Sequence, residues 1–270
     1  MTAAPATLNA TDRPPARRLA GRGMRALLLS EVRLFLRDPG SVFFALAFPA
    51  VVLIGVGFAI PGMDEPVTDP GPWQGEPTIF VMIPAVLAAA MATPALTTLP
   101  VSIASYREQG LLKRLSTTPM RPQGVLVVHV IIGVASFVVA SLLALGLAAL
   151  IFDVGGPQQL GTAVLTGVAG AAAMFGVGLL IAAVAPRGNA AQGFGMLVFF
   201  PMLFFAGLWT PGPVMPDAVA AVATWTPLGA ASQAMTTAWF EQGFPLLQML
   251  VMAGYVVVLY PLAAKLFRWS

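Results

Sequence analysis

The chain has 270 residues, of which 58% are hydrophobic and only 9% are charged. A soluble domain is nearer half apolar and a quarter charged, so this composition excludes an ordinary soluble fold and indicates a membrane protein. The net charge of +3 gives no indication of nucleic acid binding, and the absence of cysteine excludes disulfides and thiol chemistry.

The first segment, residues 1–22, is rich in Ala, Pro and Arg and lacks an apolar period, which predicts a disordered cytoplasmic tail. Residues 23–39 have the pattern of an amphipathic helix that lies along the inner membrane surface. Its apolar face holds Met24, Leu27, Leu28, Leu34 and Phe35, and its basic face holds Arg22, Arg25, Arg33 and Arg37. We expect Asp38-Pro39-Gly40 to end this helix, because proline cannot continue it.

Glu31 falls within the apolar face of this predicted helix. One interpretation is a carboxylate at the interface that reaches water. The other is a buried partner of a basic residue on a neighbouring element, because an unpaired buried charge is costly. The sequence offers Arg114 and Arg187 as partners and does not choose between them.

Residues 40–270 hold six apolar segments, each longer than the roughly 17 residues that a bilayer core requires. We therefore predict an all-α integral membrane protein with six transmembrane helices. The expected spans are residues 42–60, 78–104, 125–152, 160–185, 190–209 and 246–264.

The positions of the charges predict the orientation of these spans. All 14 Lys and Arg residues fall before span one, between spans two and three, between spans four and five, or after span six. In the loops on the opposite side, every charged residue is acidic. The positive-inside rule therefore places both termini in the cytoplasm.

Residues 105–122 form a charged island between the second and third spans, which we interpret as a cytoplasmic coupling loop that docks another protein. Leu111, Leu112 and Leu115 can share one side of a short helix there, with charged residues around the rest. The alternative is a solvated loop that only sets the topology.

Residues 210–245 are too interrupted by proline to span the membrane, but two stretches are compatible with short helices, Ala218–Thr224 and Gly229–Phe240. We predict that these helices dip into or lie on the outer leaflet as a re-entrant region.

The sequence lacks the residues that several kinds of active or binding site require. Neither lysine, Lys113 or Lys265, fits the ATP-binding pattern GxxxxGK[ST]. The one histidine, His129, is expected to be bonded locally at a helix end, and one imidazole without cysteines does not make a metal or haem site. The predicted spans hold no charged residue, which argues against an ion-driven carrier. The hydroxyl residues Thr93, Thr97 and Ser102 are candidates for lining a pathway.

Three stretches together resemble the ABC type-2 exporter permease family, which includes drug-resistance permeases of actinobacteria. They are EVR followed by LRDP over residues 31–39, YREQGLLKRL ending in Thr118-Pro119 over residues 106–119, and the run from Pro201 through FFAG to Pro211, Pro216 and Pro227. The resemblance covers nearly the whole chain. Two places depart from the family pattern: Ala206 stands where a serine is often found before the glycine, and Trp225-Thr226 stands where Asn commonly precedes the proline equivalent to Pro227.

The resemblance implies a permease that pairs with a second permease, expected to be another copy of this chain, and with two separate ATPase subunits that carry ATP and Mg²⁺. This chain itself would hold no cofactor, would be no enzyme and would lie in the bacterial inner membrane among its lipids. The interfacial helix, with Arg25, Glu31, Arg33 and Arg37, would contact the ATPase together with the coupling segment. The coupling residues implied are Tyr106, Arg107, Glu108, Gln109, Gly110, Leu111, Leu112 and Arg114, and the outer re-entrant region is marked by Pro201, Gly207, Pro211, Pro216 and Pro227.

The apolar spans favour export of a hydrophobic drug, antibiotic or lipid-like molecule. Two alternatives remain open from the sequence: a permease for polysaccharide or lipid-linked glycan, and a membrane scaffold subunit without cargo.

Overall fold

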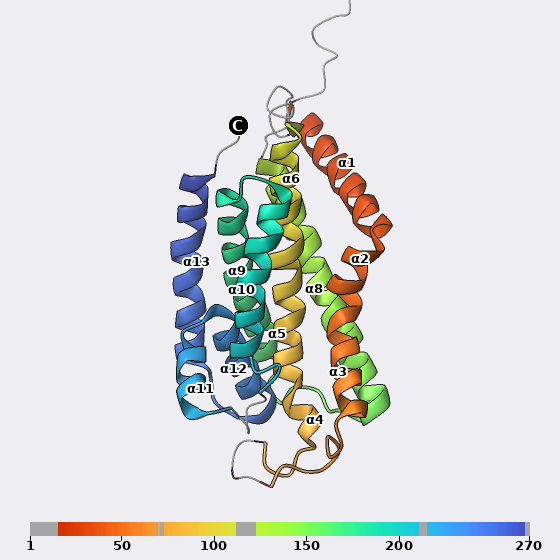
Figure 1. Cartoon of the computed structure of the whole chain (residues 1–270), viewed down its shortest axis with the longest axis vertical. Coiled ribbons are helices and arrows are strands. Elements are labelled where there is room, and N and C mark those ends of the chain that lie inside the picture. The colour runs from red at the N-terminus through yellow and green to blue at the C-terminus, as the bar shows by residue number, and fades with distance from the viewer. Residues whose placement is uncertain (1–15, 69, 71–72, 112–122, 211–214, 268–270) are drawn as a thin grey trace, which may run out of the picture.

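The computed structural model describes residues 16–68, 70, 73–111, 123–210 and 215–267, and these residues form a helical bundle without a β-strand (Figure 1). The first span comprises α2 (Pro39–Val42), η2 (Phe43–Ala47) and α3 (Phe48–Ala59), preceded by α1 (Ala16–Arg37). The second comprises α4 (Thr78–Val81), α5 (Ile83–Thr93), η3 (Pro94–Thr98) and α6 (Leu99–Glu108). The remaining helices are α8 (Gln123–Phe152), α9 (Leu160–Val184), α10 (Gly188–Phe205), α11 (Asp217–Thr224), α12 (Pro227–Phe240) and α13 (Leu246–Leu266).

The prediction of an all-α membrane protein with six spans is confirmed. Within the described ranges, 6 helices are long and apolar enough to cross a bilayer. They cover Pro39–Ala59, Thr78–Glu108, Gly124–Phe152, Leu160–Val184, Gly188–Phe205 and Leu246–Leu266. Most of these bounds lie within a few residues of the expected ones, which is the usual uncertainty of helix ends.

The second span lies at the centre of the bundle, with α13 at one edge and α1 to α3 at the other (Figure 1). Its most apolar stretch is 94% buried, whereas those of the first, fifth and sixth spans are 17% to 28% buried. The exposed apolar side chains of these outer helices suit contact with lipid or with another membrane helix. The central span is therefore the most enclosed of the six.

The expected disordered tail is wrong for residues 16–22, because α1 begins at Ala16. The residues from Ala16 onward are mainly Ala, Arg and Leu, which are strong helix formers, and the last prolines of the tail, Pro14 and Pro15, precede them. Residues 1–15 lie outside the described part of the chain.

The junction between α1 and the first span is sharp. As expected, the amphipathic helix ends before Pro39, at Arg37. Asp38 then caps α2, because its carboxylate accepts from Gly40 N–H at 3.2 Å and from the Ser41 hydroxyl at 2.5 Å. The hydrogen bond from Ser41 is the main cause that lowers the pKa of Asp38. Proline at the first helical position begins the new helix without losing a backbone bond.

Two π-helical turns, η2 and η3, interrupt the first and second spans at equivalent positions relative to a proline. Each ends two residues before its proline, Pro49 or Pro100. The bond that closes η3 joins Leu99 N–H to Pro94 O, five residues back. Because a proline ring clashes with the carbonyl four residues earlier and offers no N–H, one extra residue in the turn relieves the clash.

The π-turn η3 is packed against two glycines of neighbouring helices. A Cβ on Gly178 of α9 would overlap the Ala95 carbonyl oxygen, and a Cβ on Gly195 of α10 would overlap that of Leu96. Only glycine lets the backbones approach this closely, which is the usual role of small residues between membrane helices. The π-turn that Pro100 causes in the central span therefore requires glycine at positions 178 and 195 of the neighbouring helices.

The outer region contains the two short helices that the sequence predicts, α11 and α12. The fifth span ends at Phe205, earlier than expected, because Gly207 adopts φ +84° and its N–H donates to Phe204 O. Pro216 and Pro227 stand at the starts of α11 and α12, and Pro211 lies outside the described residues. Thr226, a departure from the family pattern, accepts from Gly229 N–H at 3.1 Å and so still caps α12.

α12 enters the bundle rather than lying on its surface. It packs against α9, α13 and α5, and most of its residues are buried. Ser232 on α12 donates to the Ala206 carbonyl at 2.7 Å, which fixes the helix to the end of α10. Pro201, also expected to belong to this outer region, lies inside α10 instead.

The match between Gly178 and η3 is tested by Gly178→Ala. The new methyl group meets a backbone oxygen that cannot move independently, so we expect a loss of about 1–3 kcal/mol in the free energy of unfolding, as for other overpacked cores. Thermal unfolding of the purified chain in detergent measures the effect.

Gly146→Ala in α8 is the matched control, because a Cβ there meets nothing within 4 Å. It should leave stability unchanged or raise it by up to about 1 kcal/mol, since alanine favours helix. Equal behaviour of the two variants would contradict the close approach at η3.

Candidate coupling site at the cytoplasmic end

The second span continues beyond its expected end at Ala104. α6 runs to Glu108, so Tyr106, Arg107 and Glu108 form the last helical turn rather than the start of a loop. Gly110 then takes φ +68° and donates its N–H to Arg107 O, which ends the helix. Leu112, Arg114 and the rest of the predicted loop to residue 122 lie outside the described residues.

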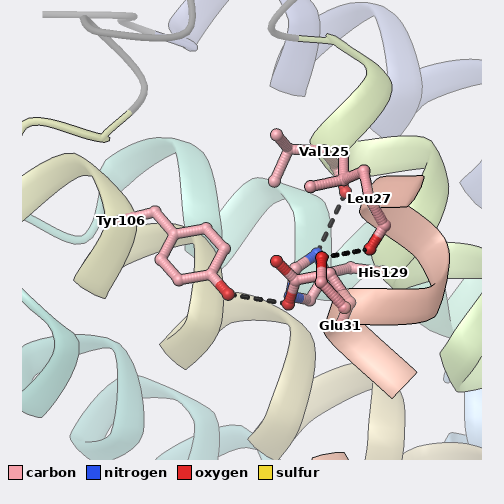
Figure 2. A network of polar contacts seen from close by, with 6 residues as sticks. Leu27, Glu31, Tyr106, Val125 and His129 are labelled. Atoms are coloured by element: carbon pink, nitrogen blue, oxygen red, sulfur yellow. Dashed lines mark hydrogen bonds and ion pairs between the residues drawn. The ribbon is translucent and has the colours of Figure 1, made fainter. Parts of the chain in front are cut away.

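Glu31 of α1 lies against this last turn (Figure 2). The Tyr106 hydroxyl donates to Glu31 Oε2 at 2.7 Å, and His129 Nε2 of α8 lies 3.6 Å from the same oxygen. The residues Glu31 and His129 are each only 7% exposed. A carboxylate removed from water in this way is stabilised by the Tyr106 hydroxyl that donates to it.

His129 is held in place from two sides. Its Nδ1 lies 3.0 Å from Val125 O, and because a carbonyl only accepts, Nδ1 donates and Nε2 is left to face Glu31. The ring also packs edge-on against Tyr106, with centroids 5.6 Å apart. The expected local bond of His129 is therefore present, but the residue also forms part of a cluster of three helices, α1, α6 and α8.

These contacts decide between the two interpretations of Glu31. Its side chain is buried against protein, so the interpretation as a carboxylate in contact with water is wrong. Its partners Tyr106 and His129 differ from the arginines that the sequence suggests, of which Arg114 lies outside the described residues. α1 packs on α8, and Tyr106 of α6 reaches Glu31 from the other side, which is why Glu31 is enclosed.

Arg107 binds the end of α9. Its Nη1 donates to Ala185 O and its Nη2 to Ala182 O, both at 3.0 Å. These are among the last carbonyls of the helix, where a cation is favoured by the helix dipole. The guanidinium also lies over the Phe267 ring, 4.9 Å from its centroid, next to the end of α13.

Glu108 binds the start of α10. Its Oε2 accepts from Gly188 N–H at 3.2 Å, at the helix end where an anion is favoured. A side chain at Gly188 would collide with Ser105, so glycine permits the contact. Arg107 and Glu108 thus hold the short turn between α9 and α10 from its two sides.

The last turn of α6 consequently contacts α1, α8, α9, α10 and the residue after α13. We call Glu31, Tyr106, Arg107, Glu108 and His129 the cytoplasmic cluster. Any displacement of α1 or of the segment after Glu108 acts directly on this cluster. The arrangement suits transmission of movement into the membrane bundle.

Other predicted docking residues lie on the surface around the cluster. The residues Arg25, Arg33 and Arg37 of α1 are exposed, and so is Gln109 after α6, while Leu111 is half-buried. Leu34, which the sequence places on the packed face, is 56% exposed instead. Its exposure beside the arginines suits contact with lipid headgroups and acyl chains.

The candidate pathway residues Thr93, Thr97 and Ser102 do not line the outer cavity that is described below. Thr93 and Thr97 donate their hydroxyls to carbonyls of their own helix, Ala89 O at 2.8 Å and Thr93 O at 2.7 Å. Thr93 is buried within the bundle, and Ser102 is half-buried near the cytoplasmic end. Their hydroxyls are therefore satisfied or placed in packing, and their role in a pathway stays a prediction.

A polar cavity of about 440 Å³ lies instead near the outer end of the bundle. The polar residues that line it from α12 are Ser232, Gln233, Thr236 and Thr237. The sequence carries a signal for this face, because positions i, i+1, i+4 and i+5 of a helix lie together. Treating Gly229–Phe240 as simply apolar misses it.

Comparison with known proteins gives one family. The sequence model of the ABC-2 type transporter family matches residues 22–240, from within α1 to the end of α12. The match includes the cytoplasmic cluster and most of the outer cavity. Comparison with curated proteins gives no match.

A double-mutant cycle tests the bond between Tyr106 and Glu31. Tyr106→Phe and Glu31→Gln should each reduce the free energy of unfolding, and the double variant should lose less than the sum. We expect a coupling of about 1–3 kcal/mol, typical of a buried hydrogen bond to a charged group. Unfolding of the full chain in bicelles measures it.

Tyr255→Phe is the matched control, since Tyr255 donates to a neutral acceptor, Trp225 O, at the far end of the bundle. Combined with Glu31→Gln it should be additive. Additivity between Tyr106→Phe and Glu31→Gln as well would show that the cluster is not energetically coupled.

Proposed function

This chain belongs to the ABC-2 type transporter family, and we propose that it is the permease subunit of an ATP-driven exporter that moves a hydrophobic small molecule, such as a drug, an antibiotic or a lipid-like compound, out of the cell. Two copies of a separate ATPase subunit bind and hydrolyse ATP with Mg²⁺. The permease sits in the bacterial inner membrane, with α1 and the end of α13 on the cytoplasmic side.

The observation that carries this proposal is the cytoplasmic cluster. A passive membrane scaffold does not require the central span to be bonded at its cytoplasmic end to α1, α8, α9 and α10. A permease driven from the cytoplasm does, because force applied to α1 or to the coupling segment must reach the buried helix.

The energy source is external to this chain. Its sequence holds no GxxxxGK[ST] pattern, and its charged residues lie at the ends of the spans rather than across the bilayer core. The ATPase would contact the exposed arginines of α1 and the region after Glu108. Closure of the ATPase pair on ATP would displace both elements.

The permease works with a second copy of itself. The fifth and sixth spans bury only 28% and 17% of their most apolar stretches within one subunit. α10 presents a row of exposed aromatic residues, among them Phe200, which stacks on Trp209. In the proposed homodimer, these aromatic residues contact the same residues of the second copy or the lipid at the edge of the pathway.

Glu108→Lys tests the coupling role. It replaces the anion at the start of α10 by a cation and reverses the charge on the docking side, so we expect export and substrate-stimulated ATP hydrolysis to fall by about tenfold or more while membrane insertion persists. Both activities are measured in proteoliposomes that hold the permease and its ATPase.

Glu65→Lys, an equal change of charge in the outer loop, is the control and should leave both activities within about twofold, as for other exposed sites. Unaltered export by Glu108→Lys would contradict the coupling assignment. Equal losses in both variants would trace the effect to the charge of the protein as a whole.

A further inference from the structure

The outer cavity is bounded by the end of α10, by α11 and α12, by the start of α13 and by the first turns of the central span. Val81 and Ala85 of that span form part of its wall. α11 and α12 lie at the end of the bundle opposite to α1 (Figure 1). The cavity therefore lies at the end of the bundle where the proposed exporter releases its substrate.

Two hydroxyl protons on the α12 face, those of Ser232 and Thr236, are already used inside the protein. Ser232 donates to Ala206 O, and Thr236 donates to Ser232 O at 3.1 Å. Each hydroxyl has one proton and two lone pairs, so both residues can only accept from a ligand. The Gln233 amide is partly engaged: it donates one N–H to Ala220 O at 3.0 Å and accepts from the Thr224 hydroxyl at 2.9 Å.

The cavity also holds a carboxylate, that of Glu241. Its backbone is fixed, since its N–H donates to Thr237 O and its carbonyl accepts from Gln159 Nε2 at 2.8 Å. Among the described residues no side chain is bonded to its carboxylate. The sequence contains no Lys or Arg between Arg187 and Lys265, so no cation of this part of the chain neutralises it.

Aromatic and apolar surfaces complete the lining. The residues Trp73 and Phe205 contribute rings, and Val81 and Met215 contribute aliphatic surface. Aromatic faces attract organic cations through their quadrupole and also bury apolar rings. Within the described residues no group of three metal-ligating side chains occurs, so the carboxylate is not part of such a metal site.

We propose that this cavity is an exit-side binding site for an amphipathic organic cation, a molecule with an apolar body and a protonated amine or aromatic amino groups. The cation faces Glu241, its N–H groups donate to the hydroxyl oxygens of α12, and its apolar body lies against Trp73 and Phe205. An anion is disfavoured there by the carboxylate of Glu241. This assignment rests on the proposed export function and names the class of its cargo.

Ethidium, an aromatic cation with two amino groups, is a suitable probe. Its fluorescence on titration with the full chain in phosphatidylcholine nanodiscs gives a dissociation constant, without ATP or the ATPase. Glu241→Gln removes the charge and keeps the shape, so we expect binding about tenfold weaker, as for loss of a charge-assisted contact. Thr236→Val, which removes one acceptor, should weaken binding by about two- to fivefold.

Asp153→Asn is the matched control, because Asp153 is an exposed acidic residue on the same side with φ 54°, a conformation that asparagine also adopts. It should leave ethidium binding within about twofold, since an exposed charge is screened. The anionic dye fluorescein should not compete.

Equal binding by the wild-type protein and Glu241→Gln, equal weakening by Asp153→Asn, or competition by fluorescein would each overturn the site. Since the titration needs no ATPase, such a result leaves the export function untouched. Conversely, binding as predicted by a chain that fails to support export would overturn the function and retain the site.

Discussion

The close contact between the π-turn of the central span and two glycines is the constraint on which the other features depend. Pro100 cannot offer an N–H to the carbonyl of Leu96, and the ring would collide with that oxygen in a regular helix. The extra residue of η3 removes the collision, and Gly178 and Gly195 make room for the displaced carbonyls. α9 and α10 are thereby fixed against the middle of the central span, which positions the end of α9 and the start of α10 beside α6.

The two candidate sites lie at opposite ends of this one span. Val81 and Ala85 line the outer cavity, and Tyr106, Arg107 and Glu108 form the cytoplasmic cluster. Between them the helix is enclosed nearly throughout, so in the proposed exporter a push at one end would be transmitted along it. The π-turn at its centre is the point where such a helix bends most readily, because its hydrogen bonds are already displaced. In the proposed exporter, closure of the ATPase would tilt the lower half of the span and alter the walls of the outer cavity.

The sequence predicts most of the architecture because its signals are local. Apolar segments of sufficient length reveal the spans, Pro39 marks the start of the first, and the prolines after residue 210 separate α11 from α12. The partner of Glu31 is not local: Tyr106 lies 75 residues away and belongs to a region that reads as a loop. The roles of Arg107 and Glu108 as caps of α9 and α10 also require the three-dimensional arrangement. Likewise, the polar face of α12 is a four-residue pattern within an apolar segment, and it becomes informative only once the helix is known to be enclosed.

The most direct test of the central claim is to purify the tagged chain in mild detergent and to identify the proteins that accompany it. An exporter permease predicts a P-loop ATPase in a one-to-one ratio with the chain. That partner should be lost when residues 109–122, which follow the last turn of α6, are replaced by a Gly/Ser linker of equal length. Recovery of the chain without any ATPase, under conditions that preserve other membrane complexes, would contradict the account.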